Sequence, residues 1–537
     1  MQSPAAARKV IPNQMGLLPT YASLQRDHVE QLQILTPAID GTVHAIYIPI
    51  AEAHDLEMFD KDKLGRLGIV GVDGSNYGAA ATESSDMGVA LDLNTGFIDP
   101  FIKGVRTATF LGNLKNADRS DSAFDSRTIL KNANASFTAL QLGTFVASCE
   151  MEFYLGFVDP TKKDAYQLTA KPRDTYYHLP FSDDPHATVR SQMAAMMISL
   201  GLPVKYHHTE VGGMTDGTIQ NEIEFNLVPI EQLGDAYIVA RYIIDAVAKK
   251  YGRSVEFSPK PFADIAGSGL HTHMYVRDAG KSMFYSPEGN LKINRLGLGF
   301  AAGILRHGRA LAAFTNPTPA SYDRLDPHFE APIHLFLGQG NRTAAIRIPK
   351  YTVTKRMGPK EGRFEYRPTD TGDGVVTIPN HNSGNPQRVS VRGNYHLILS
   401  GFLLAGMDGL RRKWDPFNLG MGPNQPDRWK ALPTSISEAA AALDADNTFL
   451  TENGIFPQEV VTRQASWLRK ILSDDQIAVL LSPAVKPSQT EDPELPPLLG
   501  SDPEWIALQS LTGGEGTVAS LSTMLQTQKE AARHGRS

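Results

Sequence analysis

Charged and imidazole side chains recur at alternate positions in four short segments of this sequence, CEMEFYL, QNEIEFNLV, GSGLHTHMYV and GRFEYRP. The residues concerned are Glu150 and Glu152, Glu222 and Glu224, His271 and His273, and the series Arg363, Glu365 and Arg367. Each segment is typical of a β-strand, in which residues i and i+2 point to the same face of the sheet. Each therefore predicts two or more charged or metal-binding groups on one face.

A solvent-facing sheet explains any one of these pairs taken alone. The set is different because the intervening residues, such as Met151, Phe153 and Ile223, are apolar. A sheet that is covered by helices buries both faces, and burial of unpaired carboxylates is costly. The cluster therefore predicts bound cations. Oxygen ligands with one imidazole favour Mg²⁺ or Mn²⁺ over a structural zinc, and we expect two or more divalent ions.

Basic side chains near these segments indicate what the ions would do. Besides those of GRFEYRP, they are Arg324, Arg342, Arg347 and Lys360. Guanidinium groups bind phosphate and carboxylate with a planar fork. Divalent ions together with several guanidinium groups meet the main needs of phosphoryl transfer, which are positioning and charge neutralisation. The sequence has no Walker lysine loop and no GxGxxG motif after a predicted strand, so no familiar nucleotide loop accounts for the cluster.

The elements that must position these residues fall into two parts. To about Arg106 the chain consists of short extended runs, QLQILTP, VHAIYIPI and GRLGIVGVDG, separated by Gly, Pro and Asp. From about Asp125 strands alternate with long helices. Helices are predicted in HATVRSQMAAMMISL, EQLGDAYIVARYIIDAVAKKYG and NYHLILSGFLLAGMDGLRRK, and a fourth begins at Ser435 with a capping-box glutamate at Glu438. We expect a small β-rich domain followed by a large α/β domain.

Length and composition exclude several classes of protein. A chain of 537 residues predicts two or more domains, and a formal charge of −6 argues against a nucleic-acid surface. The single cysteine, Cys149, excludes an internal disulfide and a zinc–thiolate cluster, and we expect it to be a buried apolar residue. The segment LGLGFAAGILRHGRALAAF predicts an amphipathic core helix, because Arg306 and Arg309 interrupt it. With no signal-peptide pattern at the start, these features favour a cytoplasmic globular protein.

Motifs in consecutive order resemble those of the glutamine synthetase family. DGSNYG and SSDMGVALDLNTGFIDPF are similar to its N-terminal signature. CEMEFYL, HHTEVGG with QNEIEF, KPFADIAGSGLHTH, SYDRLDPHFEAP, NRTAAIRIP and GRFEYRPTD resemble its catalytic motifs. The resemblance implies an α+β protein with an N-terminal β-grasp domain (1–115) and a catalytic α/β half-barrel (116–486), assembled into stacked rings. The Pro-rich arm and C-terminal helical extension that we expect at 487–537 have no counterpart in the family pattern.

The resemblance also implies two metal sites and a substrate site. One ion would lie near glutamate and ammonia, on Glu152, Glu210 and Glu222. The other would bridge the nucleotide phosphates, on Glu150, His271 and Glu365. Glutamate and the amine would be bound by Gly267, Arg324, Arg367, Asn76 and Tyr177.

Roles in catalysis and ATP binding follow from the same motifs. Glu330 resembles the flap glutamate that takes a proton from the amine, Arg342 would meet the phosphates, and Asp73 would bind and deprotonate the amine from a neighbouring subunit. ATP would be bound by His273, Arg347, Lys360 and Arg363. The implied reaction is phosphorylation of the γ-carboxylate of glutamate by ATP, followed by attack of the deprotonated amine.

Departures from the family pattern bear on the amine. Asn76 stands where the family has a serine, and Tyr77, Gly78 and three alanines follow it. About four extra residues lie between Glu210 and Glu222, and Ala266 replaces the usual residue before the GSG turn. Trp429 stands where some bacterial members carry a regulatory tyrosine, so adenylylation is not expected.

These departures favour a primary organic amine as acceptor, such as aniline, an alkylamine or a polyamine. Small side chains after Asn76 leave volume, and the ring of Tyr77 would cover an apolar substituent. Ordinary glutamine synthesis from ammonia is the alternative. A non-catalytic structural or sensing relative is more remote, because every expected metal ligand is present.

Three further residues have simpler explanations. Glu224, the extra acid beside Glu222, is interpreted as a polar partner inside the protein. His207 and His208 precede Glu210 and are interpreted as structural histidines.

Overall fold

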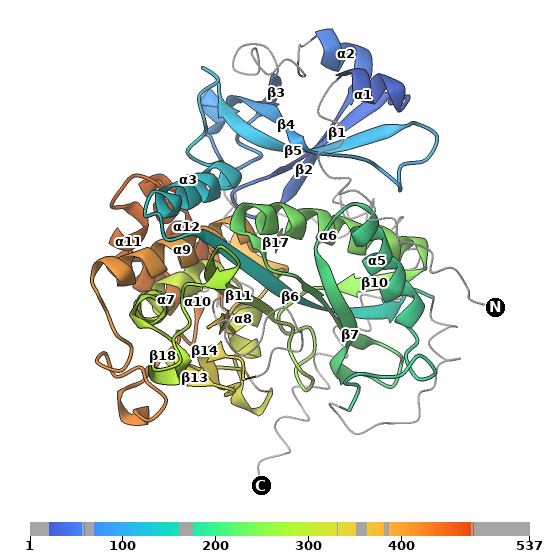
Figure 1. Ribbon diagram of the computed structural model, residues 1–537. Coiled ribbons are helices and arrows are strands. Elements are labelled where there is room, and N and C mark those ends of the chain that lie inside the picture. Colours follow the sequence, from blue (N-terminus) through green and yellow to red (C-terminus); the bar gives the residue numbers. More distant parts are fainter. Residues whose placement is uncertain are drawn as a thin grey trace, which may run out of the picture. The chain divides into compact units, whose positions relative to one another are not determined.

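The computed structural model describes residues 21–55, 58, 69–159, 175–329, 331–350, 362–380, 386–473 and 476 (Figure 1). These residues belong to the first of two units, Met1–Leu480. The predicted arm and C-terminal extension at 487–537 belong to the second unit and lie outside the described residues.

The first part of the chain forms a five-stranded mixed sheet in the order β2-β1-β5-β4-β3. Its strands are β1 (Gln31–Pro37), β2 (Val43–Pro49), β3 (Ile69–Asp73), β4 (Asp86–Ile98) and β5 (Thr107–Asn116). β1 and β5 are parallel, and the other neighbours are antiparallel. Helices α1 (Tyr21–Arg26) and α2 (Ile50–Asp55) and the short turn η1 (Thr82–Ser84) complete this part. The three predicted strands are confirmed as β1, β2 and β3.

A larger sheet follows, with β6 (Thr144–Phe157) near its centre. The path is β18-β13-β14-β15-β11-β6-β8-β7, and β9, β10 and β12 pair at its side. The strands are β7 (Val204–Gly213), β8 (Ile219–Phe225), β9 (Val228–Pro229), β10 (Arg253–Glu256), β11 (Leu270–Asp278), β12 (Lys281–Ser282), β13 (His334–Gln339), β14 (Ala344–Ile348), β15 (Phe364–Tyr366) and β18 (Lys430–Ala431). β16 (Gly374–Pro379) and β17 (Pro386–Val391) form a separate hairpin.

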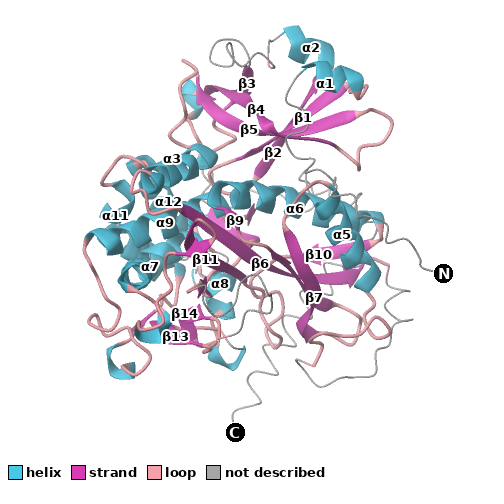
Figure 2. Cartoon of the chain, viewed as in Figure 1, coloured by secondary structure: helices cyan, strands magenta, loops and turns pink. Residues whose placement is uncertain are grey.

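Helices accompany this sheet, and Figure 2 shows α5 and α6 running alongside β6 and β7. The α-helices are α3 (Ser126–Thr138), α5 (Ala187–Ser199), α6 (Ile230–Lys250), α7 (Arg295–Thr315), α8 (Pro319–Arg324), α9 (Tyr395–Arg411), α10 (Ile436–Ala445), α11 (Thr448–Thr451) and α12 (Gln458–Lys470). The short 3₁₀ turns are η2 (Asn290–Lys292), η3 (Pro327–Phe329) and η4 (Pro426–Arg428).

Capping residues mark the ends of several helices, and the predicted start at Ser435 is among them. The Asn394 side chain accepts a hydrogen bond from Leu397 N at the start of α9, and Ser435 accepts one from Glu438 N at the start of α10. α6 is followed by Gly252 with φ of +63°, a conformation that glycine adopts without strain. The predicted core helix is α7, most of which is buried. No helix in the described part of the chain is both long enough and apolar enough to cross a membrane.

The strand β6 separates two environments. Cys149, Met151 and Phe153 are fully buried in the hydrophobic core, which confirms the prediction for Cys149. The alternate residues Glu150 and Glu152 point to the opposite face. One face of the sheet therefore stabilises the fold, and the other carries the charged residues.

Candidate active site

The register of the large sheet brings the predicted charged pairs together. On β6 and β8, Glu150 lies opposite Glu224 and Glu152 lies opposite Glu222. On the other side of β6, His271 of β11 lies opposite Glu150. Residues directly opposite one another on antiparallel strands have their side chains about 5 Å apart, so these groups must interact.

β15 extends the same charged face. His273 of β11 lies opposite Glu365, and Arg347 of β14 lies opposite Glu365 from the other side. Arg347 Nε donates to Glu365 Oε2 and Arg367 Nη1 donates to Glu365 Oε1, each at 2.5 Å. Glu365 is completely buried, so these two guanidinium groups are what makes its charge tolerable.

Among the described residues, three groups of side chains have the spacing of metal sites, and two of them correspond to the sites that the resemblance implied. Glu150, His271 and Glu365 offer ligand atoms that lie within 4.8 Å of one another, as the resemblance implied. The other group is Glu210 and Glu222 with His208 in place of the expected Glu152. Both offer carboxylate oxygens and one imidazole, a set that suits Mg²⁺ or Mn²⁺.

Glu152 remains beside both groups. Its Oε2 accepts hydrogen bonds from Gly269 N at 2.7 Å and from Gln220 Nε2 at 3.0 Å. Its Oε1 lies 3.9 Å from His271 Nδ1. The sequence reasoning missed Gln220 and Gly269, although Gln220 lies two residues before Glu222 and therefore on the same face of β8.

The electrostatics of the two groups differ. Burial, and after it the charge of Glu152, raises the pKa of Glu210 to about 8. Burial and the charges of Glu150 and Glu210 raise the pKa of Glu222 well above its usual range. By contrast, burial is outweighed at Glu150, where His273 and His271 hold the pKa of the carboxyl well below its usual range. Both shifts mean that the ionised forms of Glu210 and Glu222 are disfavoured beside the other carboxylates, and a bound cation would stabilise them.

A cavity of about 170 Å³ opens above these carboxylates. The predicted site residues that line it are Glu150, Glu152, Tyr177, Glu210, Glu222, Gly267, His271, Arg324, Arg342, Arg347 and Arg367. Arg324 is buried and donates to the carbonyls of Pro368 and Arg367 at 2.8 and 3.1 Å, which fixes its guanidinium plane. The cavity therefore combines an anionic floor with several guanidinium groups.

Aromatic rings form one wall of this cavity. Tyr177 stacks on His178 with ring centroids 3.8 Å apart, and His208 lies 4.3 Å from His178 and 5.6 Å from Tyr177. The backbone of His178 is left-handed, with φ of +55°, and its N–H donates to Thr209 O at 3.0 Å. A left-handed backbone is uncommon for a residue with a side chain and is concentrated at functional sites.

Comparisons with known proteins agree with this geometry. The family model described as glutamine synthetase, catalytic domain, matches residues 123–373. A glutamine synthetase from Nostoc sp. is 30% identical over 446 residues, which cover 76% of this chain and 87% of the relative. One from Frankia alni is 30% identical over 442 residues, with the same coverage of both chains.

The chain belongs to the glutamine synthetase family. It is therefore an ATP-dependent ligase that forms a carbon–nitrogen bond on glutamate. The family works with divalent metal ions in general, which agrees with the donor sets on β6, β7, β8, β11 and β15.

Solved structures extend the likeness to most of the fold. The cryo-EM structure of Plasmodium falciparum glutamine synthetase has a TM-score of 0.68 at 20% identity and covers 86% of this chain and 98% of that one. A GmaS/ADP complex has a TM-score of 0.65 at 20% identity, covering 84% of this chain and 95% of that one. The predicted α+β class of the glutamine synthetase family is thereby confirmed.

Some predicted site residues of this family member lie apart from the cavity. Asp73 and Asn76 belong to the end of β3 and the turn after it, in the five-stranded sheet. Arg363 precedes β15 and is not among the residues that line the cavity. Glu330 and Lys360 lie outside the described residues.

The structure changes the interpretation of Tyr77 and His208 and agrees with that of His207 and Glu224. Tyr77 was expected to cover an amine substituent, but it is 6% exposed and packs against His44 in the core of its own sheet. His208 lies at ligand distance from Glu210 and Glu222, whereas its neighbour His207 accepts a hydrogen bond from Arg190 at 3.2 Å in a structural network. Glu224 pairs with Lys205 inside the protein, as interpreted from the sequence.

Proposed function

We propose that this protein joins the γ-carboxylate of glutamate to a primary organic amine, at the expense of ATP, through γ-glutamyl phosphate. The observation that carries the proposal is the anionic strand face bounded by Arg324, Arg342, Arg347 and Arg367 in the cavity. Such a face suits a reaction whose first step transfers a phosphoryl group between two anions.

Two divalent ions, Mg²⁺ or Mn²⁺, belong to the proposal. Glu150, His271 and Glu365 would hold one, and Glu210 and Glu222 with Glu152 or His208 would hold the other. When bound, such ions neutralise phosphate charge and orient the reacting oxygens. The raised pKa of Glu210 supports an ion there, because a buried carboxylate beside other carboxylates is stabilised by a nearby cation.

The chain's own residues would bind, orient and accept protons. Arg324 and Arg367, with the Gly267 backbone, would fix glutamate so that a γ-carboxylate oxygen attacks the terminal phosphorus of ATP. That step forms the O–P bond of γ-glutamyl phosphate and releases ADP. The amine nitrogen then attacks the acyl carbon and phosphate leaves with the former carboxylate oxygen.

The amine must lose a proton as it attacks, and Asp73 and Glu330 are the proposed acceptors. Asp73 Oδ1 accepts hydrogen bonds from the Ser75 hydroxyl at 2.6 Å and from Ser75 N at 2.9 Å, and these lower the pKa of Asp73. Asn76 Nδ2 donates to Asp73 Oδ2 at 3.0 Å. These contacts keep the carboxylate ionised and oriented at neutral pH.

Asp73 also contacts Ser85 and is fully exposed, and its resemblance to the family aspartate supports the proposal that it serves the site of a neighbouring subunit. We propose ring oligomers on this basis. His273, Arg347, Lys360 and Arg363 are the proposed ATP contacts. Because the reaction consumes ATP, we propose the cytoplasm as its location.

The choice of an organic amine rests on Tyr177 and His208, which line the cavity, and on His178, which packs against both of them. Aromatic faces beside carboxylates bind a cationic head with an apolar body better than they bind small, strongly hydrated ammonium. Asn76 in place of the family serine supports the same choice. The two structural relatives do not decide it, since the glutamine synthetase and GmaS are equally distant at 20% identity.

Ammonia is the second candidate, favoured by the names of the relatives at 30% identity. The test is kcat/KM for ammonium, methylamine, putrescine, isopropylamine and aniline at saturating glutamate and ATP, followed as ADP release. We expect at least one organic amine to exceed ammonium. An advantage of tenfold or more for ammonium would make the protein an ordinary glutamine synthetase.

A further inference from the structure

The two oxygens of the Glu150 carboxylate face different histidines. Oε2 lies 2.9 Å from His271 Nδ1, whereas Oε1 lies 2.6 Å from His273 Nε2. Because His271 faces Oε2, the proposed ion on Glu150, His271 and Glu365 would lie on that side. The Oε1 side is therefore a separate position on the same carboxylate.

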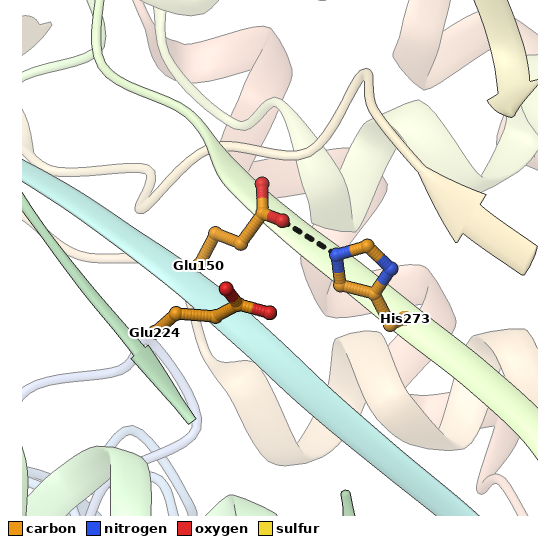
Figure 3. Close-up of side chains that lie close together, drawn as sticks. All are labelled: Glu150, Glu224 and His273. Atoms are coloured by element: carbon orange, nitrogen blue, oxygen red, sulfur yellow. Dashed lines mark hydrogen bonds and ion pairs between the residues drawn. The ribbon is translucent and has the colours of Figure 1, made fainter. Parts of the chain in front are cut away.

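Glu224 completes a second group on that side. Glu150, Glu224 and His273 offer ligand atoms that all lie within 4.8 Å of one another. Figure 3 shows the three side chains coming from three neighbouring strands, with the Glu224 carboxylate turned toward the gap beside Glu150 and His273. Glu224 and His273 are each only 1% exposed, so bulk water does not solvate this group.

The two oxygens of the Glu224 carboxylate differ in their contacts. Lys205 Nζ donates to Oε1 of Glu224, and the hydroxyl of Tyr206 interacts with the same carboxylate, but Oε2 is buried and no donor among the described residues reaches it at hydrogen-bonding geometry. A buried carboxylate oxygen without a partner costs free energy that a bound cation would recover.

We propose a third divalent-cation site, formed by Glu150 Oε1, Glu224 Oε2 and His273 Nε2, that shares the Glu150 carboxylate with the ion on His271 and Glu365. Two oxygens and one imidazole suit Mn²⁺ or Mg²⁺, whose ligands lie at about 2.1 Å. Two ligand atoms that are each about 2.1 Å from one ion are at most roughly 4 Å apart. The present ligand atoms lie within 4.8 Å of one another, so small side-chain movements would bring them to that separation. A bridging carboxylate is a common arrangement of paired ions about 3.5–4 Å apart. This inference rests on the proposed function in one respect, namely that the neighbouring ion on Glu150, His271 and Glu365 belongs to that function.

Lys205 determines the strength of this site. Its ammonium group neutralises part of the Glu224 charge, so the third ion binds more weakly than the other two. Replacement of this lysine by an uncharged side chain of similar length removes the competing cation. Loss of the Glu224 charge is therefore expected to prevent binding of the third ion, whereas loss of the Lys205 charge is expected to strengthen it.

The test is a titration of the full-length oligomer with Mn²⁺ alone, without nucleotide or substrates, in which free Mn²⁺ is measured by electron paramagnetic resonance. Wild type is expected to bind three ions per subunit. Glu224→Gln is expected to bind two, and Lys205→Met three with at least tenfold tighter binding of the last. Glu459→Gln, an exposed residue in the first turn of α12, is the matched control and should equal wild type.

Circular dichroism and light scattering establish that each variant keeps the wild-type fold and assembly. If Glu224→Gln then misfolds, the Lys205→Met arm still decides the question. The proposal of a third site would be overturned by any of three results. These are two bound Mn²⁺ ions per subunit in wild type, three in Glu224→Gln, or a third ion that binds only to Lys205→Met. ADP release by wild type, measured separately, tests the proposed function, and its failure leaves the ion count unaffected.

Discussion

Two buried clusters of charge in this protein differ in how completely they are paired. At Arg127, Nε and Nη2 donate to the two oxygens of Asp235, each at 2.8 Å, and Nη2 also donates to Asp92 at 2.7 Å. His396 and Asn113 complete this cluster. Burial is outweighed there by Arg127, which holds the pKa of Asp235 below its usual range.

At Glu210 and Glu222, other carboxylates and the imidazole of His208 lie close by instead. Burial and neighbouring carboxylates raise the pKa values of both groups. The Arg127 cluster joins β4, β5, α3, α6 and α9 into one structure, whereas the glutamates face a cavity. Charges that are paired within the chain stabilise the fold, whereas carboxylates gathered beside a cavity form a site that a cation would stabilise.

The largest expected effect is on catalysis. Glu152→Gln and Glu365→Gln should each abolish ADP formation with glutamate and amine, because each removes one charge from the proposed ion sites while keeping the side-chain shape. ADP release is measured alongside light scattering, with Glu459→Gln as the control. More than about a tenth of wild-type turnover in either variant, ~1.4 kcal/mol of barrier, would contradict the assignment.

The next prediction concerns the free energy of unfolding, to which the paired Arg127 cluster contributes. Arg127→Met should lower the free energy of unfolding by about 3 kcal/mol, because it removes a buried guanidinium and leaves the half-buried Asp235 and Asp92 without their counter-charge. Arg306→Met, which breaks an exposed pair with Asp446, should change it by less than about 1 kcal/mol. Urea titration at fixed protein concentration measures both. Equal decreases in the free energy of unfolding for Arg127→Met and Arg306→Met would contradict a structural role for the Arg127 cluster.

The last prediction concerns the pH dependence of the free energy of unfolding, to which the buried ring of His186 contributes. Burial lowers the pKa of His186 to about 4, and Arg253 Nε donates to its Nδ1 at 3.1 Å. The unfolded chain, with a pKa of about 6.5, binds the proton first as pH falls, so the folded state loses stability below pH 6.5. Between pH 7.5 and 5.5 this loss should be about 1.4 kcal/mol.

His186→Asn isolates this contribution, because asparagine does not titrate. The difference in unfolding free energy between wild type and this variant should narrow by about 1.4 kcal/mol from pH 7.5 to pH 5.5. A difference that stays constant between the two pH values would mean that His186 does not titrate in this way.

Much of this arrangement could be predicted from the sequence, because alternation along one strand is local. Glu150 with Glu152, and His271 with His273, needed only the two-residue period of a strand. The positions of His208 and Lys205 needed the register between β7 and β8, which shifts at two irregularities. No local pattern encodes such a shift, so their parts in the site could be found only from the structure.

Apart from Tyr177, the aromatic residues near the cavity escaped prediction for a similar reason. Tyr77 lies next to Asn76 in sequence, and its burial against His44 depends on packing within the five-stranded sheet. Tyr177 and His178 reach His208 only because the chain before α5 lies against β7, where Thr209 O accepts from His178 N. Contacts between distant segments decided which aromatic residue lies beside the carboxylates.

The most direct test of the account follows an oxygen atom. Glutamate with both γ-carboxylate oxygens replaced by ¹⁸O is incubated with ATP, a divalent ion and the best acceptor amine, and the released phosphate is analysed by mass spectrometry. The account predicts one ¹⁸O in each phosphate, because the carboxylate oxygen bonds to phosphorus and its bond to carbon breaks when the amine attacks. Unlabelled phosphate, released at the rate of ADP formation, would contradict it.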